Sequence, residues 1–538
     1  MKTSAILILF FLLFCFENSA QVPSLQFQKP LGGTKSDKGY CIAALADGTY
    51  VIAGEADSWN GNMTGNHGPA DIWLAKLDSS LNVIWQKSLG GSNGDGANSV
   101  QQTFDGGFIL LGYTNSDDGD VSGLHIDFAP RNDYWVVKTD SLGNIQWQKC
   151  LGGTFWEEGY EVKQTSDSGY VLIGKATSGD GDVTNHHGYC SGCEEDFWVV
   201  KLDQSGNIQW EQAYGASGMD VGVSISQTLD GGYIAAGYTA STDSDVVGNH
   251  GATDAWVLRL DSSGAVIWKN CYGGPLSETA ESIIEAGDGG FIFAGWAEAD
   301  GGDVSGSHGG GDFWIVKLNS AGILQWQKCL GGSGPEVPGG IQKTNDNGFI
   351  IAGDADSNDG DVSGGHGAGD FWIVKIDSIG NIQWQKCLGG SDADVAYEVR
   401  QTPDSGFVAI GYTRSNDGDV SGLHTPCSWG VASCDDYWVV KLGPISTRLA
   451  APPNTITDFA VYQNPLVKSI DVSFYANGNE KENVQLIDIT GRILLQDAFA
   501  ATNGLNKHRI FTGDLGGGIY FVRLQGGGEA VTKKVAIQ

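Results

Sequence analysis

The chain has 538 residues and a formal net charge of −33, with 64 acidic against 31 basic side chains. Nucleic-acid-binding proteins carry a basic footprint, so this composition excludes that class. The 81 glycines would suit a low-complexity chain, but 17 tryptophans supply more large apolar surface than disordered chains contain. Many turns combined with a tryptophan-rich core favour an all-β protein built from many short strands.

The first twenty residues are predicted to be a signal peptide. Lys2 supplies the basic end, an apolar run covers residues 5–16, and Ala20 offers a small residue for cleavage. The run is too short to span a bilayer, and no later apolar stretch approaches about 18 residues. We therefore expect an exported chain without a membrane span.

A repeat of about 58 residues fills residues 22–443. The spacings between the tryptophans that mark successive copies are 62, 63, 58, 58 and 58 residues, and Phe27 lies 58 residues before the first of them. These tryptophans begin WQKCLGG or a close variant of it, at Trp85, Trp147, Trp210, Trp268, Trp326 and Trp384. A fixed period of this size is the signature of a repeat architecture.

Each copy is expected to form four strands. In the sixth copy, apolar segments at 339–344, 349–355, 370–377 and 382–390 alternate with turns rich in Gly, Asp, Asn and Ser. The third segment is apolar almost throughout, which is typical of a strand buried on both faces of its sheet. Four antiparallel strands per copy, in seven copies, predict a seven-bladed β-propeller.

The two ends of the repeat favour a closed ring over an open solenoid. The first copy begins with a segment of the fourth type, at residues 25–33, and the last copy stops after a segment of the third type, at residues 435–443. The spare first strand can complete the last blade, which removes the exposed sheet edges that an open array would carry.

The turn between the third and fourth segments resembles two known propeller signatures. Residues 260–268, LDSSGAVIW, place Asp, Gly and Trp in the order of sialidase Asp-boxes and of the tryptophan-docking repeats of quinoprotein-type propellers, at a spacing that differs from both. The resemblance implies a blade hairpin with a docking tryptophan, and it carries over neither sialidase nor quinone chemistry.

The loop between the second and third segments carries the most polar motif of the repeat. Its histidine occurs in all seven copies: His67, His125, His187, His250, His308, His366 and His424. The residue five positions earlier is Asn62 in the first copy and otherwise aspartate: Asp120, Asp182, Asp245, Asp303, Asp361 and Asp419. Each third segment then opens on an aspartate: Asp71, Asp133, Asp196, Asp254, Asp312, Asp370 and Asp436.

Three interpretations of this loop remain open. Aspartates commonly cap turns through backbone N–H groups, so a structural role is favoured. The oxygen-rich stretch NDGDVSG at 358–364 could instead bind calcium, although it lacks EF-hand spacing. The calcium ligands would be Asp118, Asp120, Asp180, Asp182, Asp359, Asp361, Asp417 and Asp419. A transition-metal or catalytic site in every blade is the third interpretation, and seven near-identical active sites in one chain would be unusual.

Three copies extend this loop, directly after His125, His187 and His424. Arg131 and Trp429 lie in the extensions and could stack on or pair with a ligand, so these five residues are the ligand-binding candidates. Two cysteine pairs also lie there, and in an exported protein each pair is expected to form a local disulfide: Cys190 with Cys193, and Cys427 with Cys434. The remaining mature-chain cysteines are expected to be small buried side chains: Cys41, Cys150, Cys271, Cys329 and Cys387.

After a Pro/Ser/Thr-rich linker at residues 444–456, short alternating strands at 457–538 predict a small β-sandwich. Its features are YQNP at 462–465, LIDITGR at 486–492, Gly504 before a strand, LGGGIYFVRL at 515–524 and KKVAIQ at 533–538. In this order they resemble the type A C-terminal sorting domain of the type IX secretion system of Bacteroidota, with Gln463 standing where that family usually has Pro. A fibronectin-like binding module is the alternative without the resemblance.

The resemblance implies that the domain is a partner of the type IX secretion machinery. Transport across the outer membrane, removal of the domain, and release or attachment at the cell surface would follow. The sorting-signal residues that the resemblance implies are Asn464, Pro465, Gly491, Gly518, Tyr520, Lys533 and Lys534.

Near-equal blades without a unique catalytic constellation favour a secreted or cell-surface binding protein for a glycan or protein ligand. Calcium is the one cofactor that the loops suggest. The alternative is an extracellular polysaccharide lyase or glycosidase with its site at the propeller mouth. A glycosidase needs two carboxylates at a defined separation. The asymmetric acidic candidates are Glu194, Glu195, Asp435 and Asp436.

Overall fold

The computed structural model describes residues 21–125, 131–187, 194–424, 434–444, 456–464, 468–476, 481–502, 504–513, 515–526 and 529–537. All regular structure within them is β, and the chain divides into two compact units, Met1–Ile445 and Ser446–Gln538. The predicted signal peptide lies outside the described residues. Among the residues described, no helix is long and apolar enough to cross a membrane.

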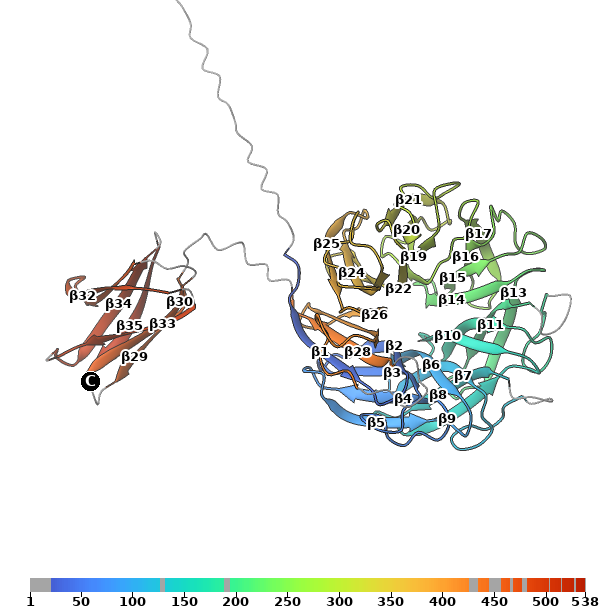
Figure 1. Ribbon diagram of the computed structural model, residues 1–538, viewed down its shortest axis with the longest axis horizontal. Coiled ribbons are helices and arrows are strands. Elements are labelled where there is room, and N and C mark those ends of the chain that lie inside the picture. Colours follow the sequence, from blue (N-terminus) through green and yellow to red (C-terminus); the bar gives the residue numbers. More distant parts are fainter. Residues whose placement is uncertain are drawn as a thin grey trace, which may run out of the picture. The chain divides into compact units, whose positions relative to one another are not determined.

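The first unit is built from four-stranded antiparallel sheets that follow one another around a common axis (Figure 1). Between Leu25 and Leu442 the described chain forms seven such sheets, which we number as blades in chain order. Blade 1 consists of β2 (Asp37–Ala44), β3 (Tyr50–Ala56), β4 (Asp71–Leu77) and β5 (Val83–Leu89). Blade 2 consists of β6 (Asp95–Gln102), β7 (Phe108–Thr114), β8 (Asp133–Thr139) and β9 (Ile145–Leu151).

The next four blades repeat this order, with the first strand nearest the axis. Blade 3 consists of β10 (Glu157–Gln164), β11 (Tyr170–Ala176), β12 (Asp196–Leu202) and β13 (Ile208–Tyr214). Blade 4 consists of β14 (Asp220–Gln227), β15 (Tyr233–Thr239), β16 (Asp254–Leu260) and β17 (Val266–Tyr272). Blade 5 consists of β18 (Ser282–Glu285), β19 (Phe291–Ala297), β20 (Asp312–Leu318) and β21 (Leu324–Leu330). Blade 6 consists of β22 (Glu336–Lys343), β23 (Phe349–Ala355), β24 (Asp370–Ile376) and β25 (Ile382–Leu388).

Blade 7 combines both ends of the repeat. Its strands are β26 (Asp394–Gln401), β27 (Phe407–Thr413), β28 (Asp436–Leu442) and, as the outer strand, β1 (Leu25–Leu31). The antiparallel register pairs Leu31 with Tyr437 and Phe27 with Lys441, and Figure 1 shows blue β1 beside orange β28. The predicted β-propeller of repeated four-stranded blades, closed by the spare first strand, is confirmed.

Apolar packing between neighbouring blades forms the core. The third strand of each blade is almost entirely buried, as its composition predicted, and each contributes a tryptophan with at most 1% exposure: Trp73, Trp135, Trp198, Trp256, Trp314, Trp372 and Trp438. Trp372 packs against Phe313 of the preceding blade, with ring centroids 4.6 Å apart. At about 25 cal/mol per Å² of buried apolar surface, these inter-blade clusters are the main source of stability.

The fourth-strand tryptophans dock on the next blade. Trp210 Nε1 donates a hydrogen bond to the carbonyl of Ser262 at 3.2 Å, and its ring covers Gly264 in the same turn. Gly264 has φ +84°, and a Cβ there would lie 2.9 Å from the indole. Both the backbone conformation and the lack of space therefore require glycine at this position. This is the docking hairpin that the turn sequence predicts.

The second unit contains two antiparallel sheets. One consists of β29 (Ile456–Asn464), β30 (Ser469–Ala476) and β33 (Gly504–Phe511). The other consists of β32 (Ile493–Ala500), β31 (Lys481–Asp488), β34 (Gly518–Gly526) and β35 (Glu529–Ile537). Ile470, Val472 and Phe474 of the first sheet share one core cluster with Val484 and Val522 of the second, as in the predicted β-sandwich.

Candidate functional site

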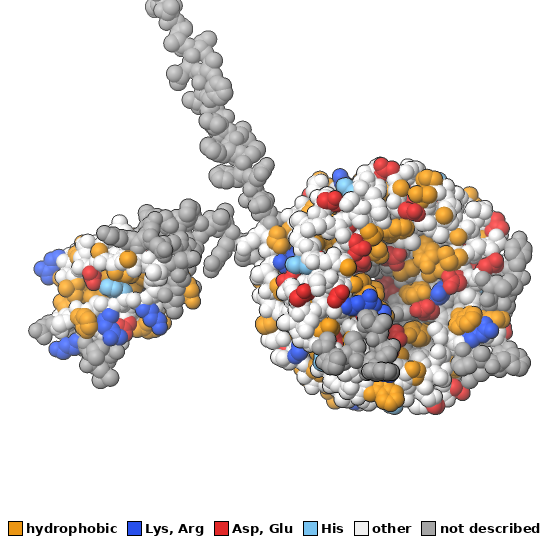
Figure 2. All heavy atoms as spheres, in the orientation of Figure 1, with side chains coloured by type: hydrophobic (Ala, Val, Ile, Leu, Met, Phe, Trp, Pro, Cys, Tyr) orange, Lys and Arg blue, Asp and Glu red, His pale blue; other side chains and the backbone are white. Residues whose placement is uncertain are grey.

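Two kinds of segment share one face of the ring. In a four-stranded antiparallel blade, the loop after the second strand and the connection from the fourth strand to the next blade lie at the same ends of the strands. We call this the mouth face. It carries the histidine loops of all seven copies, and Figure 2 shows the hollow at the centre of the ring, with hydrophobic and acidic side chains around it.

Each loop histidine is held by the aspartate that opens the third strand of its own blade. His125 donates its backbone N–H to Asp133 Oδ2 at 3.0 Å, and its Nδ1 lies 2.7 Å from the same oxygen. This side-chain hydrogen bond raises the pKa of His125, because Asp133 favours the charged imidazole. The same two contacts join the other predicted ligand-binding histidines to their own aspartates, His187 to Asp196 and His424 to Asp436.

Several of these histidines also reach the next blade. Nε2 of His125 lies 3.8 Å from Asp182 Oδ2, which belongs to the loop of blade 3. His308 approaches Asp361 at 3.9 Å, and His366 approaches Asp419 at 3.8 Å in the same way. The imidazole therefore bridges adjacent loops of the mouth.

The calcium candidates are bonded to the backbone of the blade connections. Asp118 Oδ1 accepts the N–H of Ser92 at 2.7 Å, and Asp120 Oδ2 accepts that of Gly90 at 3.4 Å. Equivalent bonds involve Asp180, Asp182, Asp359 and Asp417, whereas Asp361 and Asp419 face the imidazoles just described. Over the residues that the structure describes, no group of three or more His, Cys, Asp or Glu side chains is placed to hold a metal ion. Calcium binding by these aspartates stays a prediction.

A second buried carboxyl group completes each blade junction. A Cβ on Gly331 would lie 2.2 Å from Asp312 Oδ1 and 2.3 Å from Glu336 Oε2, so the two carboxyl groups flank one glycine. Both are fully buried, Glu336 accepts the N–H of Gly332 at 2.8 Å, and Asp312 Oδ1 has no hydrogen-bond partner. We call these the junction pairs: Asp71/Asp95, Asp133/Glu157, Asp196/Asp220, Asp254/Glu278, Asp312/Glu336, Asp370/Asp394 and Asp436/Asp37.

Burial dominates the electrostatics of the junction pairs. It raises the pKa of Glu157 and of Glu278 to about 7, and the facing aspartate adds to both shifts. Asp95, Asp220 and Asp394 are raised to about 6 for the same reason. The loop histidine, the junction pair and the loop aspartate thus form a set of contacts that recurs at the blade junctions, and three of the histidines also approach the aspartate of the next loop.

The residues that face the axis of the ring vary between blades, unlike the junction residues. The first strands of six blades have a β-bulge or irregularity at one position, which holds Tyr40, Asn98, Tyr160, Val223, Gly339 or Tyr397. Glu281 stands directly before the short β18 at the matching place. All seven line a central cavity of about 430 Å³. A bulge redirects one side chain, and here it aims one residue of each of these six blades into the channel.

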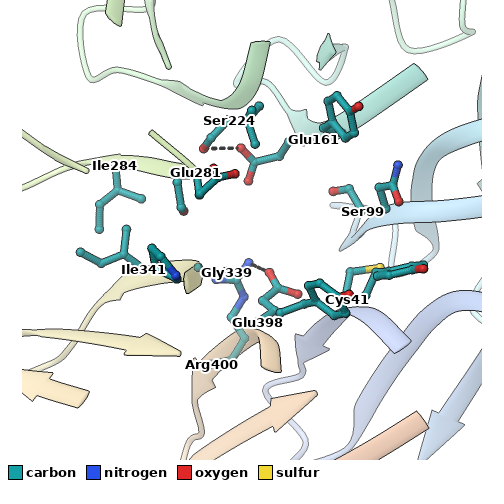
Figure 3. A pocket seen from close by; sticks show the side chains of 18 of the residues that line it. Cys41, Ser99, Glu161, Ser224, Glu281, Ile284, Gly339, Ile341, Glu398 and Arg400 are labelled. Carbon is teal, nitrogen blue, oxygen red and sulfur yellow. Dashed lines mark hydrogen bonds and ion pairs between the residues drawn. The ribbon is translucent and has the colours of Figure 1, made fainter. Parts of the chain in front are cut away.

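Two of the three glutamates in this cavity are already engaged. Glu161 lies 2.5 Å from Lys163 Nζ and accepts hydrogen bonds from Ser224 Oγ at 2.8 Å and Ile225 N at 2.7 Å. Glu398 is paired with Arg400 and accepts the N–H of Ile42 at 2.5 Å. Figure 3 shows the contact of Ser224 with Glu161 and the pair of Arg400 with Glu398, and it places Glu281 beside Ser224 and Glu161. Burial raises the pKa of Glu281, which has no ion pair among the described residues.

The opposite wall of the cavity is apolar. Ile284, Val337, Pro338 and Ile341 line it, and the glycines at 339 and 340 leave bare backbone between them. In Figure 3, Ile284 and Ile341 lie across the opening from Cys41 and Ser99. The cavity therefore offers polar groups on one side and a flat apolar surface on the other, which suits a ligand with both kinds of surface.

Aromatic side chains also stand on the mouth face. Arg131, a predicted ligand-binding residue, stacks on Phe155 and Trp156 at 4.5 and 4.4 Å from the ring centroids. Trp156 remains 49% exposed, and Trp59 in the loop of blade 1 is 65% exposed. Trp429, also predicted, lies outside the described residues. Sequence reasoning missed Trp59 and Trp156, which interrupt the repeat: Trp59 stands where the other copies have Asp, Asn, Gly or Thr, and Trp156 where most have a small residue.

The acidic candidates of the enzyme hypothesis have structural partners. Glu195 lies 2.9 Å from Lys175 Nζ. Asp435 accepts from Arg414 Nε at 2.5 Å and from Ser36 Oγ at 2.7 Å, which links blade 7 to blade 1. Glu194 contacts His186 through its carbonyl, and Asp436 belongs to a junction pair.

The cysteines separate into two groups. Cys41, Cys150, Cys271, Cys329 and Cys387 are free and buried, as predicted. Cys434 is buried as well, with its sulfur 4.0 Å from the carbonyl of Thr34. Its predicted partner Cys427 lies outside the described residues, as do Cys190 and Cys193, so both disulfides stay predictions.

The C-terminal unit carries the predicted sorting-signal residues on turns and strand ends. Gly491, with φ +87°, forms the turn between β31 and β32. Gly518 and Tyr520 lie in β34, and Lys533 and Lys534 are exposed on β35. Asn464 ends β29, and Pro465 lies outside the described residues.

Residues 460–538 match the family described as the secretion system C-terminal sorting domain, which confirms the resemblance drawn from the motifs. Fold and sorting domain together define an exported β-propeller protein, directed to the cell surface or secreted. No curated protein matches the chain.

Solved structures that resemble the chain share only the propeller-like fold. Puromycin hydrolase is 11% identical with a TM-score of 0.42, and the match covers 85% of this chain but 62% of the hydrolase. A putative gluconolactonase is 8% identical with a TM-score of 0.32, over 77% of this chain and 92% of that one. A glycoside hydrolase family 32 protein from Bifidobacterium adolescentis is 10% identical with a TM-score of 0.24, over 78% and 79%. Identities this low carry no argument about activity.

Proposed function

We propose that the exported propeller is a non-catalytic binding protein whose ligand is a glycan, held at the mouth face with one end in the central channel. One observation carries the proposal. The junction network repeats around the ring, whereas the residues that the bulges aim into the channel differ from blade to blade. A ligand without sevenfold symmetry needs such an asymmetric site.

The chemistry of the site fits a sugar chain. Trp59 and Trp156 expose flat rings on the mouth face, and Tyr40, Tyr160 and Tyr397 line the channel below. Aromatic rings offer large apolar contact area at low entropic cost and pack against the C–H faces of sugars. Asn98 and the serines of the wall can exchange hydrogen bonds with sugar hydroxyls.

The catalytic alternative, a polysaccharide lyase or glycosidase, finds less support in these contacts. A two-carboxylate mechanism needs one group free to move a proton and one free to attack or activate water. Glu161 and Glu398 are each tied to a cation and to a backbone amide. We therefore favour binding without turnover.

The test is a glycan-array screen of the purified chain, followed by calorimetric titration of each hit and a search for cleavage products. Trp59→Ala and Trp156→Ala should each weaken binding by about tenfold, equal to about 1.4 kcal/mol. Phe104→Ala is the matched control, because Phe104 is 72% exposed on a turn at the opposite ends of the strands. Failure of every glycan to bind, or cleavage of a bound glycan, would overturn the proposal, and capture of a protein ligand instead would redirect it.

A further inference from the structure

We infer that the glycan end held in the channel carries a protonated amine, as amino sugars do, and that Glu281 recognises it. This inference rests on the proposed function, because it names the chemical class of the same ligand. It follows from the charges that line the cavity, from the groups around Glu281 and from the field of the whole chain.

The lining charges are unbalanced. Glu161, Glu281 and Glu398 face the cavity together with Lys163 and Arg400. Both cations are committed, Lys163 to Glu161 and Arg400 to Glu398. Among the described residues Glu281 is left with no cation, although it sits half-buried between two blades. Its carboxyl group shares a hydrogen bond with Thr279, but burial still raises its pKa, and a cationic ligand group would stabilise the ionised form.

Glu281 also stands beside aromatic rings. Tyr40, Tyr160 and Tyr397 line the same cavity as Glu281. Burial raises the pKa of Tyr238 in β15 to about 12, and the charge of Glu281 adds to this shift. Tyr160 lies in the same group, since Tyr238 contributes to its own raised pKa. A carboxylate with adjacent tyrosine rings is the arrangement that binds ammonium groups, because the ring faces and the carboxylate both attract positive charge.

The surroundings discriminate between ligand classes. The chain carries a net charge of −33, so its field attracts cations toward the channel and repels anions. Uronic acid or sulfated glycans would bring a second anion to a carboxylate that has no cation beside it among the described residues. Neutral glycans would leave Glu281 without a cation. An amine-bearing sugar is the class that satisfies the site.

The experiment compares two tetrasaccharides that differ only at nitrogen, one of glucosamine and one of N-acetylglucosamine. Binding to the purified chain is measured by calorimetry in about 0.15 M salt, where distant surface charges are largely screened. We expect the amine form to bind at least about tenfold more tightly than the acetylated form. Glu281→Gln should abolish that preference, and Glu281→Asp, which keeps the charge, should retain part of it.

The matched control is Glu298→Gln, which removes an exposed carboxylate from the same blade and should keep the preference. Thermal unfolding of each variant shows that it is folded. Equal binding of the two tetrasaccharides by the parent chain would overturn the inference and leave the proposed function standing. A preference that survives Glu281→Gln would overturn the role of Glu281. Absence of binding by any glycan would overturn the proposed function and this inference with it.

Discussion

The blade junctions and the channel wall are built from the same strands, yet they obey opposite rules. In all seven blades the first strand begins with the acidic residue of the junction pair, from Asp37 to Asp394, and this residue is always Asp or Glu. Three residues after that acid, the position that is bulged in six of the blades holds three tyrosines and four unlike residues. The residues that recur in every blade lie at the junctions that hold the ring together. The residues that differ between blades line the channel, where a ligand could be recognised.

The largest expected effect that distinguishes the two regions is the pH dependence of stability. The folded pKa of Glu157 and of Glu278 is about 7, against an ordinary value of 4.5. Between these values the folded chain binds more protons than the unfolded chain, so the free energy of unfolding falls as pH rises from 4.5 to about 7 and then levels off. Each such pair should contribute on the order of 1–3 kcal/mol, measured by denaturant unfolding across this range.

Glu278→Gln sharpens this test. The neutral amide still accepts the N–H of Gly274 but never ionises, so the variant should be more stable than the parent above pH 7 and close to it at pH 4.5. Stability of the parent chain that rises between these two values would contradict the assignment of the junction pairs.

The next effect concerns the glycine that separates each pair. Gly331→Ala places a Cβ against both Asp312 and Glu336 and should cost about 3 kcal/mol of unfolding free energy. Gly94→Ala is the control on the same face, since its nearest side-chain atom would be 3.7 Å away, an ordinary contact. A cost for Gly331→Ala no larger than that of the control would show that the junctions are loosely packed.

A smaller loss is expected at the loop histidines. His125→Ala removes the Nδ1 contact with Asp133 and the approach to Asp182, while the backbone N–H of residue 125 still reaches Asp133. The expected cost is about 1.5 kcal/mol, the lower end of the range for one hydrogen bond to a charged group. Glycan affinity should be unchanged if the histidine serves only the junction, and calorimetry on the same variant decides this.

The smallest effect on stability is expected in the channel. Tyr397→Phe removes a half-buried hydroxyl and keeps the edge contact with Tyr40, whose ring centroid is 5.0 Å away. Its unfolding free energy should change by less than about 0.5 kcal/mol, whereas glycan affinity should fall measurably. The reverse result, a destabilised ring with intact binding, would show that Tyr397 serves stability as the junction residues do. It would then contradict the distinction between junctions and channel.

The sequence predicted the parts of the molecule that repeat. Trp372 and its six equivalents predicted a strand buried on both faces, and the spare strand at Leu25–Leu31 predicted closure of the ring. Both predictions rest on periodicity, which can be read from the order of residues along the chain. For the loop histidines the sequence favoured a structural role but left calcium and catalytic interpretations open, and His125, His187 and His424 stay ligand-binding predictions.

The channel could not be predicted in the same way. The bulge that turns Tyr397 toward the axis depends on pairing geometry, and no single residue type marks it. Glu281 reaches the cavity from the position directly before β18. The pairing of Lys163 with Glu161, which leaves Glu281 without a cation among the described residues, depends on side-chain contacts that periodicity does not contain. Exposure of Trp156 depends on which neighbours happen to cover it.

The strand that closes the ring sets an order of events for export. β1 is made first, and its partner β28 is made more than four hundred residues later, directly before the sorting domain. A chain emerging from its amino end must therefore wait, with an open ring and an unpaired strand edge, until its last blade has arrived. Because the sorting domain follows the last propeller strand, a chain that carries a complete sorting domain already contains every strand that the ring needs to close.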